Sequence, residues 1–173
     1  LAACTTTPTP DPETTPEETG TVETTPEPAE EVAQGVTDTE VLVANCAATE
    51  GGYSVVGVPF NAGIEAYFKM VNANGGINGR QIKFIHQSDD AEPTKAITCA
   101  QTMVEDEKVF AFVGHFYTGS IVATMDYLIE KGIPQVYYAS GVNTLFNEDA
   151  TGNERASFPV QPILITEGQV MVA

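Results

Sequence analysis

Between residues 41 and 160, short apolar runs alternate with stretches in which apolar residues recur every three or four positions. A short continuous apolar run is typical of a strand covered on both faces, and the longer spacing is typical of a helix with one buried stripe. Strands and helices that alternate in this way form parallel pairs through right-handed crossovers. The sequence therefore predicts an α/β fold built on a doubly wound parallel sheet. The expected strands are 41–44, 82–85, 109–113, 134–138 and 158–160.

Three helices are expected between the first four strands. The first ends at Asn74-Gly75-Gly76, because glycine accepts the left-handed conformation at a helix C-terminus. The second begins at Pro93, and the acidic residues Asp89 and Asp90 before it suit a helix N-terminus. The third runs from about Ser120 to Lys131. The expected inward stripes are Ile64, Tyr67, Phe68 and Val71 in the first helix, Ile97, Ala100, Met103 and Val104 in the second, and Ile121, Met125, Leu128 and Ile129 in the third.

The part of the chain before residue 40 has a different composition. Residues 5–39 consist largely of Thr, Pro and Glu, and the first forty residues carry ten acidic side chains and no Lys or Arg. Such a segment buries too little apolar surface to fold, so residues 5–39 are expected to form a disordered linker. The formal net charge of the whole chain is -17, and no basic patch is present. Binding to nucleic acid is therefore excluded.

The three cysteines have separate interpretations. Leu1-Ala2-Ala3-Cys4 resembles a bacterial lipobox, which makes residues 1–4 the remnant of a signal peptide and Cys4 an acylated residue that anchors the protein to the outer face of the cell membrane. The alternative is an incidental cysteine. Cys46 and Cys99 lie in an expected strand and an expected helix. A disulfide between them is one interpretation, and two reduced, buried side chains are the favoured one.

The motifs of common enzymes are absent from the sequence. The glycine-rich run at 75–79 ends a helix and precedes a strand, which is the reverse of the order in a dinucleotide-binding turn. Neither a nucleophile elbow nor a phosphate-binding loop occurs, and His86 and His115 lack the spacing of metal ligands. No catalytic residue, metal or cofactor is expected.

A binding site is expected where the loops follow the carboxyl ends of the strands, because ligands of open parallel sheets bind there. Four loops meet this condition: 46–54, 88–92, 114–120 and 139–144. The third combines glycines, the hydroxyl groups of Thr118 and Ser120 and a helix N-terminus, which together favour a carboxylate. The fourth is also small and polar. The alternative for each loop is an ordinary capped turn.

Several segments together resemble a known family. They are the run 72–80 (NANGGINGR), Gly57 and Gly63 at the start of the first helix, Asp89-Asp90 followed by Pro93, and Gly114-His115 at the end of the third strand. They are similar to the type 1 periplasmic binding proteins, specifically the branched-chain amino-acid-type receptors of ABC importers. The resemblance covers residues 40–173 and implies that these form the Rossmann-like first lobe of a two-lobed hinge protein. The second lobe is expected to be absent, since an apolar segment that starts at Ile163 has no terminating cap.

This resemblance implies a function and a set of site residues. The expected function is an extracytoplasmic receptor, without catalysis, that delivers a small polar ligand, an amino acid or a related compound, to the membrane permease of an ABC importer. The alternative is a ligand-sensing module of a membrane signalling receptor. The implied ligand-binding residues are Tyr53 and Ser54 in the first loop, Tyr117 and Thr118 in the third, and Ser140, Gly141 and Asn143 in the fourth.

Overall fold

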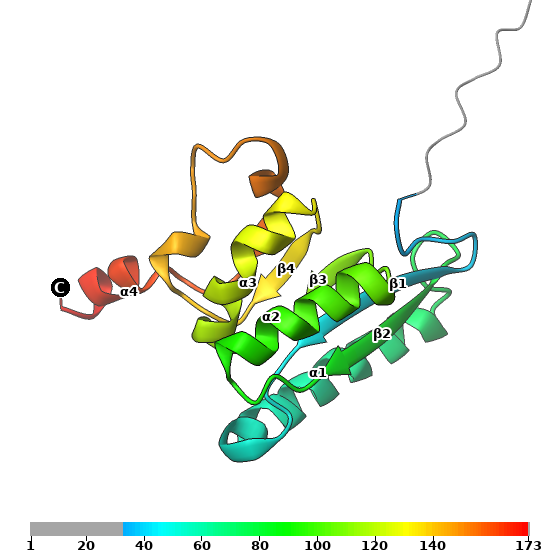
Figure 1. Cartoon of the computed structure of the whole chain (residues 1–173), viewed down its shortest axis with the longest axis horizontal. Helices are drawn as coiled ribbons and strands as arrows, with labels where there is room; N and C mark the ends of the chain where they lie inside the picture. The colour runs from blue at the N-terminus through cyan, green and yellow to red at the C-terminus, as the bar shows by residue number, and fades with distance from the viewer. Residues whose placement is uncertain (1–32, 173) are drawn as a thin grey trace, which may run out of the picture. The chain divides into compact units, whose positions relative to one another are not determined.

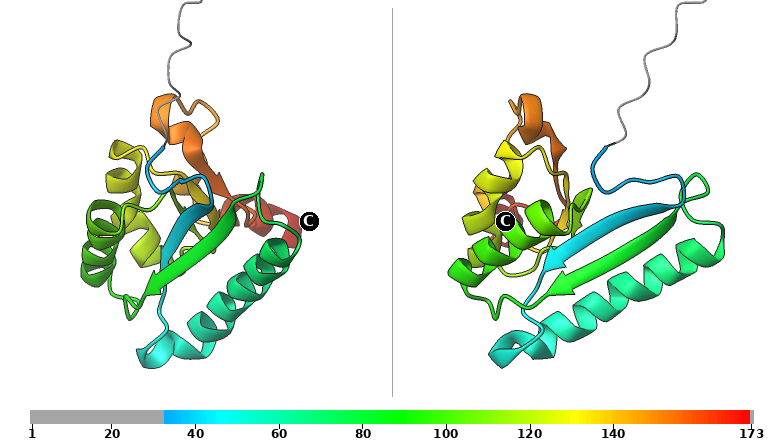
Figure 2. Two further views of the ribbon diagram at one scale, coloured as in Figure 1. Left: turned by 90° about the vertical axis from the view of Figure 1, so that its right-hand side faces the viewer. Right: turned by 45° about the vertical axis from the view of Figure 1, so that its right-hand side comes forward.

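The structure is a computed structural model, and it describes residues 33–172. Five parallel strands form one sheet in the order β2-β1-β3-β4-β5. Helices α2 and α3 cover one face of this sheet and α1 covers the other (Figures 1 and 2). The predicted doubly wound α/β fold is therefore confirmed. The elements are β1 (Glu40–Cys46), η1 (Gly51–Tyr53), α1 (Ser54–Ala73), β2 (Gln81–Gln87), α2 (Pro93–Gln101), η2 (Thr102–Asp106), β3 (Ala111–Val113), α3 (Thr118–Glu130), β4 (Gln135–Tyr138), η3 (Asn143–Leu145), η4 (Gly152–Ala156), β5 (Ser157–Pro159) and α4 (Leu164–Met171).

Two apolar cores lie on opposite faces of the sheet. On the side of α1, Phe68 and Val71 pack against Val43, Ile82 and Ala111 of three neighbouring strands. On the side of α2 and α3, a larger cluster includes buried residues from β1, β3 and both helices. Apolar strands between two helical layers are what the continuous apolar runs predicted.

The helices begin where expected and bury the expected apolar stripes, with three differences. α2 begins at Pro93, but α3 begins at Thr118, two residues before its expected start. Tyr67 of α1 is 60% exposed and Ile97 of α2 is 37% exposed, so both lie at the edge of their helical stripes and outside the core. An amphipathic helix buries only the middle of its apolar stripe against the sheet. Residues at the margin of the stripe stay partly exposed to water.

Asp89 and Asp90 do not cap α2, contrary to the expectation. The residue that precedes the helix is Glu92, and it makes no side-chain capping hydrogen bond. Oδ1 of the buried Asp89 instead accepts a hydrogen bond from the Ala91 N–H at 3.0 Å. Asp90 forms an ion pair with Lys95 in the first turn of α2, which lowers the pKa of its carboxyl group.

The turn between α1 and β2 depends on two particular residues, an asparagine and a glycine. The side chain of Asn72 accepts a hydrogen bond from the Ile82 N–H and donates one to the Ile82 carbonyl, both at 2.8 Å. The amide thus pairs with β2 as a neighbouring strand would. Gly76 has a φ of +74°, and a Cβ there would collide with the carbonyl of Arg80. The turn therefore requires both the asparagine and this glycine.

The folded region begins before residue 40. Residues 33–39, which composition assigned to the linker, hold contacts with the domain: the Gln34 amide donates hydrogen bonds to the carbonyls of Val104 and Val109 at 3.2 and 3.0 Å. Val36 also pairs with Val41 of β1. The remaining linker residues and the lipobox with Cys4 lie outside the described residues.

Cys46 and Cys99 form a disulfide, so the favoured interpretation of two reduced side chains is wrong. Cys46 ends β1 and Cys99 lies in α2, and both are fully buried in the same apolar cluster. Their Cα atoms are 6.1 Å apart, a separation that a disulfide spans. The crossover that returns α2 over β1 brings together two residues 53 positions apart in sequence.

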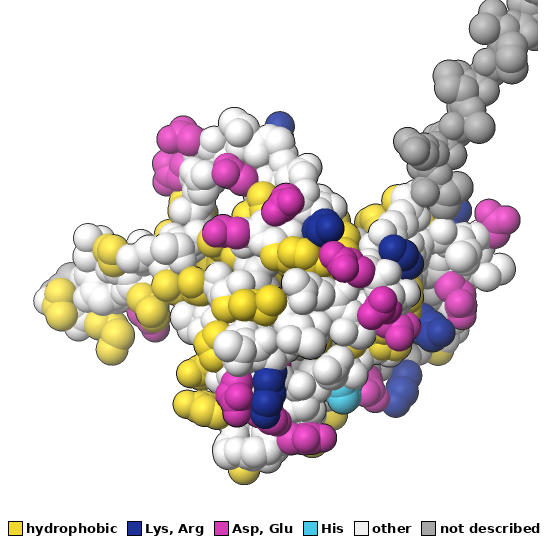
Figure 3. Space-filling model, in the orientation of Figure 1, with side chains coloured by type: hydrophobic (Ala, Val, Ile, Leu, Met, Phe, Trp, Pro, Cys, Tyr) yellow, Lys and Arg dark blue, Asp and Glu magenta, His cyan; other side chains and the backbone are white. Residues whose placement is uncertain are grey.

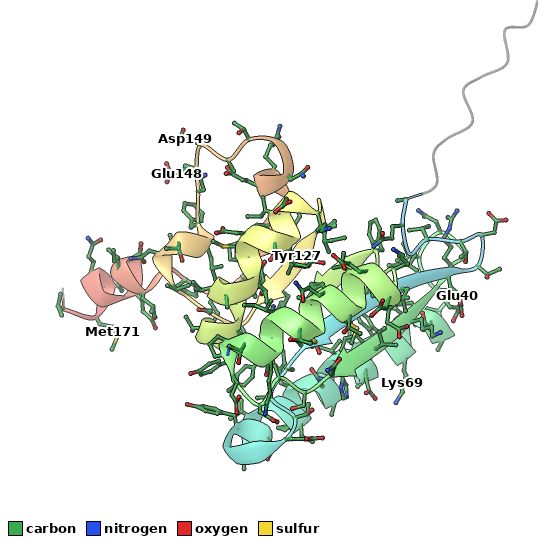
Figure 4. The ribbon with its side chains drawn as sticks, viewed as in Figure 1. Glu40, Lys69, Tyr127, Glu148, Asp149 and Met171 are labelled. Atoms are coloured by element: carbon green, nitrogen blue, oxygen red, sulfur yellow. A yellow bond between two sulfur atoms is a disulfide. The ribbon has the colours of Figure 1, made fainter. Side chains whose placement is uncertain are left out.

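A polar cluster on the surface connects α3 with η2. The phenol of Tyr127 donates a hydrogen bond to Oε1 of Glu105 at 3.0 Å, and Lys131 lies 3.2 Å from the same oxygen. Figure 4 shows Tyr127 on α3, beside the neighbouring helix. Burial and the Glu105 carboxylate raise the pKa of Tyr127 to about 12, so its phenol stays protonated at neutral pH.

Candidate functional site

The order of the strands marks one position at the carboxyl edge of the sheet. β1 lies between β2 and β3 in the sheet. The connection that follows β1 leads to β2 on one side of it, and the connection that follows β2 leads to β3 on the other side. The loops that follow β1 and β3 therefore diverge, and the crevice between them is where open parallel sheets bind ligands. Tyr53 belongs to the first of these loops, while Tyr117 and Thr118 belong to the second.

Tyr53 and Tyr117 meet across this position. Their ring centroids are 5.2 Å apart and the ring planes are tilted by 51°. Tyr53 is 49% exposed and Tyr117 is half-buried. Tyr117 has a φ of 78°, which is rare for residues with a side chain and costs free energy unless neighbouring contacts hold it.

Thr118 and Ser140 bring the loops after β3 and β4 together. Their hydroxyl oxygens are 2.9 Å apart, and the Ser140 oxygen also accepts a hydrogen bond from the Val142 N–H at 3.3 Å. Thr118 is the first residue of α3, and no side chain caps this helix N-terminus. Unpaired N–H groups and the helix dipole make such an end attractive to an anion. Two hydroxyl groups and a helix N-terminus thus converge at one point.

The other predicted site residues lie nearby without joining this pair. The Ser54 hydroxyl donates to the Gly51 carbonyl at 2.8 Å, within its own turn. Gly141 is buried against Pro162 and Leu164, and Asn143 is exposed at the start of η3. Among the described residues, no hydrogen bond links Ser54 or Asn143 to the hydroxyl pair.

Asn45 and Asn61 are functional candidates that sequence reasoning missed. Both side chains are buried, and the Asn45 amide donates hydrogen bonds to Asn61 Oδ1 at 2.8 Å and to the Gly114 carbonyl at 3.0 Å. These bonds tie β1, α1 and the loop after β3 to one another. The signal in the sequence was an asparagine directly after the apolar run 41–44 of β1, at Asn45.

His115 is a further buried group beside the site. It precedes Phe116 and Tyr117, its side chain is 1% exposed, and its Nδ1 lies 3.5 Å from the Thr124 hydroxyl. Burial lowers the pKa of His115 to about 3, so its imidazole is neutral at physiological pH. A neutral ring that packs on Phe112 acts as part of the core beneath the loop. Within residues 33–172, no three His, Cys, Asp or Glu side chains gather as the ligands of a metal ion would.

The hollows of the surface lie mainly away from this crevice. A cavity of about 330 Å³ includes Ser140 and Gly141, and an apolar groove of about 640 Å³ runs between α1 and the neighbouring strands, with Phe60, Ile64 and Tyr137 in its wall.

Basic side chains do not gather on the face shown in Figure 3. None of the helices in the described part of the chain has the length and apolar character required to cross a membrane.

The chain resembles proteins of known family. The family model for periplasmic binding proteins matches residues 40–162. The Leu/Ile/Val-binding protein homolog 2 of Brucella abortus is 34% identical over 103 residues, which is 59% of this chain and 28% of that protein. The chain therefore spans well under half the length of this relative.

Two solved structures share the fold at lower identity. A substrate-binding periplasmic protein from Ralstonia solanacearum has a TM-score of 0.65 and 22% identity, and the match covers 78% of this chain and 38% of that one. A branched-chain amino acid transporter substrate-binding protein from Streptococcus pneumoniae, in complex with isoleucine, has a TM-score of 0.54 and 23% identity, covering 57% of this chain and 28% of that one.

Proposed function

The chain belongs to the periplasmic binding protein family, and on this premise we propose that it is part of an extracytoplasmic receptor for an ABC-type importer. The receptor binds a small polar ligand, an amino acid or a related compound, and delivers it to the membrane permease without catalysis. The observation that carries the proposal is the Thr118–Ser140 hydroxyl pair at the uncapped N-terminus of α3. The names of the relatives favour transport over a sensing role.

The proposed site binds the carboxylate of the ligand. One hydroxyl of the pair donates to the other and leaves one hydroxyl proton to donate to a carboxylate oxygen. The first N–H groups of α3 add further donors and a partial positive charge. Donors fixed at a helix end favour an anion without requiring a Lys or Arg at the site. A hydrogen bond to a charged group is worth about 1.5–3 kcal/mol.

We further propose that residues 40–173 form one lobe of a two-lobed hinge receptor. A single sheet edge covers one side of a ligand, whereas small-molecule sites bury about 70–90% of the ligand surface. A second lobe that closes on this edge supplies the opposite wall, including the acidic group that an amino acid requires for its ammonium. Tyr53 in the loop after β1 is 49% exposed, which leaves part of its ring available to such a second lobe.

The proposed location is the outer face of the cell membrane, with a lipid anchor on Cys4. The Cys46–Cys99 disulfide supports an oxidising compartment, since structural disulfides are rare in the cytosol. The lipobox-like Leu1-Ala2-Ala3-Cys4 supports the anchor. Cell fractionation of a Cys4→Ser variant tests it. Release from the membrane fraction is expected, and retention would contradict the anchor.

Calorimetric titration of the full-length protein with a panel of amino acids and related carboxylates tests the binding site. We expect Thr118→Ala to weaken binding by about 10- to 150-fold, the equivalent of a lost hydrogen bond to a charged group. Thr118→Ser keeps the hydroxyl and is the matched control, with affinity within a fewfold of the unaltered protein. Equal affinities for the Ala and Ser variants would remove Thr118 from the site.

A further inference from the structure

We propose that Asn78 is a site of spontaneous covalent modification, at which the side-chain amide is hydrolysed by water to give aspartate or isoaspartate. The sequence contains two Asn–Gly pairs, Asn74-Gly75 and Asn78-Gly79, both in the run 72–80 between α1 and β2. An asparagine followed by glycine undergoes this reaction with the least steric hindrance, because glycine has no Cβ beside the attacking nitrogen. The two pairs lie in different hydrogen-bonded surroundings, and this difference selects Asn78.

The reaction takes place within one residue pair and consumes only water. The backbone nitrogen of Gly79 loses its proton to a base in the solvent and attacks Cγ of Asn78. A new C–N bond forms, the bond between Cγ and the amide nitrogen breaks, and that nitrogen takes a proton from the solvent and leaves as ammonia. A water molecule then opens the cyclic succinimide at either carbonyl, which gives aspartate or isoaspartate. No atom is oxidised or reduced.

Asn78 and Gly79 are the two central residues of a tight turn. The Ile77 N–H donates to the Arg80 carbonyl at 2.8 Å, and the Arg80 N–H donates to the Ile77 carbonyl at 2.9 Å. The φ angles of Asn78 and Gly79 are 50° and 82°, both positive as in a type I′ turn. The peptide group between these two residues can rotate into the type II′ arrangement with both closing bonds intact, because glycine accepts either sign of φ.

This rotation brings the reacting groups together. The first central residue of a type II′ turn has a ψ of about -120°, which places the next backbone nitrogen on the same side as the residue's own Cβ, as closure of the succinimide ring requires. Among the described residues, neither the Asn78 side chain nor the Gly79 N–H has a hydrogen-bond partner. Both residues are exposed, and no atom lies within 4 Å of the place where Gly79 would carry a Cβ. The turn therefore leaves the rotation and the attack unhindered.

Hydrogen bonds restrain the other pair, Asn74-Gly75. The Asn74 side-chain amide donates to the Met70 carbonyl at 2.8 Å, and the Gly75 N–H donates to the Asn72 carbonyl at 3.1 Å. Both bonds close the C-terminal end of α1, and both must break before the Gly75 nitrogen can attack. Two hydrogen bonds of ordinary strength correspond to a difference in rate of about 5- to 150-fold. We expect Asn78 to be converted faster than Asn74 by this factor.

Conversion changes the turn that joins α1 to β2. Isoaspartate adds the side-chain carbon of residue 78 to the backbone between the two closing hydrogen bonds, so the turn cannot keep its geometry. The Arg80 side chain, whose Nε–H donates to the Thr37 carbonyl at 2.6 Å, ties the same turn to the segment before β1. Converted molecules should therefore unfold at a lower temperature. Each carries one additional negative charge, so anion-exchange chromatography separates them from the unconverted protein.

Mass spectrometry of the aged protein measures the conversion. The folded full chain is incubated in mildly alkaline buffer, and aliquots are digested with trypsin. Cleavage after Lys69 and Arg80 releases both Asn–Gly pairs in one peptide, 70–80. Fragmentation of this peptide assigns the mass increase of an Asn-to-Asp conversion to position 74 or to position 78. An aliquot that was never incubated corrects for conversion during the digestion.

A variant and an unfolded control separate the chemistry from the effect of the fold. Gly79→Ala adds a Cβ beside the attacking nitrogen, so it should slow conversion at Asn78 and leave Asn74 unchanged, with thermal unfolding to show that the variant is folded. In urea both pairs should convert at similar rates, because the turn and the hydrogen bonds are lost. If Asn74 converts as fast as Asn78 in the folded protein, or if both convert in urea and neither does when folded, the proposal is overturned.

Discussion

Removal of the Cys46–Cys99 disulfide tests how this domain is stabilised. The bridge links residues 53 positions apart, and chain-entropy arguments for a loop of that length give about 4 kcal/mol at 25 °C. Both side chains are fully buried in an apolar cluster, so Cys46→Ala with Cys99→Ala replaces them by small apolar groups and leaves no buried charge. A free energy of unfolding of about 5–15 kcal/mol is usual, and a loss of about 4 kcal/mol is therefore a large part of the total.

Urea unfolding followed by circular dichroism measures this loss. With a denaturant dependence of about 2 kcal/mol per molar urea, the midpoint should fall by about 2 M. The unaltered protein under reducing conditions should unfold at nearly the same concentration as the double variant, because both lack the same constraint. A midpoint shift below about 0.5 M would refute the loop-entropy reasoning. Reaction of both Cys46 and Cys99 with a thiol reagent in the untreated protein would show instead that the bridge is absent.

Two further changes test particular residues. Burial lowers the pKa of His115 from 6.5 to about 3, so the unfolded chain binds the proton first. The free energy of unfolding should therefore fall as the pH drops from about 6.5 towards 3, by about 2–3 kcal/mol at pH 4.5. Thermal melts of His115→Gln should show a shallower pH dependence, and an unchanged one would contradict the burial argument. Gly76→Ala should cost more stability than Gly75→Ala, since both have positive φ but only position 76 faces a backbone carbonyl. Equal melting temperatures of these two variants would contradict the collision at Gly76.

The fold was predictable because its determinants are local. Apolar periodicity identifies strands and helices, and glycines such as Gly76 mark where a helix ends. The disulfide was not predictable, because the spacing of Cys46 and Cys99 says nothing about which crossover brings them together. Gln34 was assigned to the linker by the composition around it, and its hydrogen bonds to two carbonyls of the domain depend on tertiary structure alone.

The sequence predicted which loops form the candidate site. It did not predict which residues of these loops contact one another. Strand order places the loops after β1, β3 and β4 at one edge, and the sequence identified Tyr53, Tyr117, Thr118 and Ser140 within them. Which of these residues touch depends on backbone conformations that composition does not encode, such as the positive φ of Tyr117. The hydroxyl pair and the tyrosine pair therefore emerged only from the structure.

The buried polar groups below the crevice indicate which part of the site is rigid. The Asn45 amide is paired with Asn61 and with the carbonyl of Gly114, so any shift of α1 or of the loop after β3 would leave a buried polar group unpaired, at a cost of about 1–3 kcal/mol. These bonds fix the two loops that carry Tyr53 and Tyr117. The loop after β4 is anchored as well, by the Thr118–Ser140 hydroxyl contact and by the hydrogen bond from the Leu164 N–H to the Gly141 carbonyl at 2.9 Å. We therefore expect the loops after β1, β3 and β4 to keep their conformation when a ligand binds at this edge of the sheet.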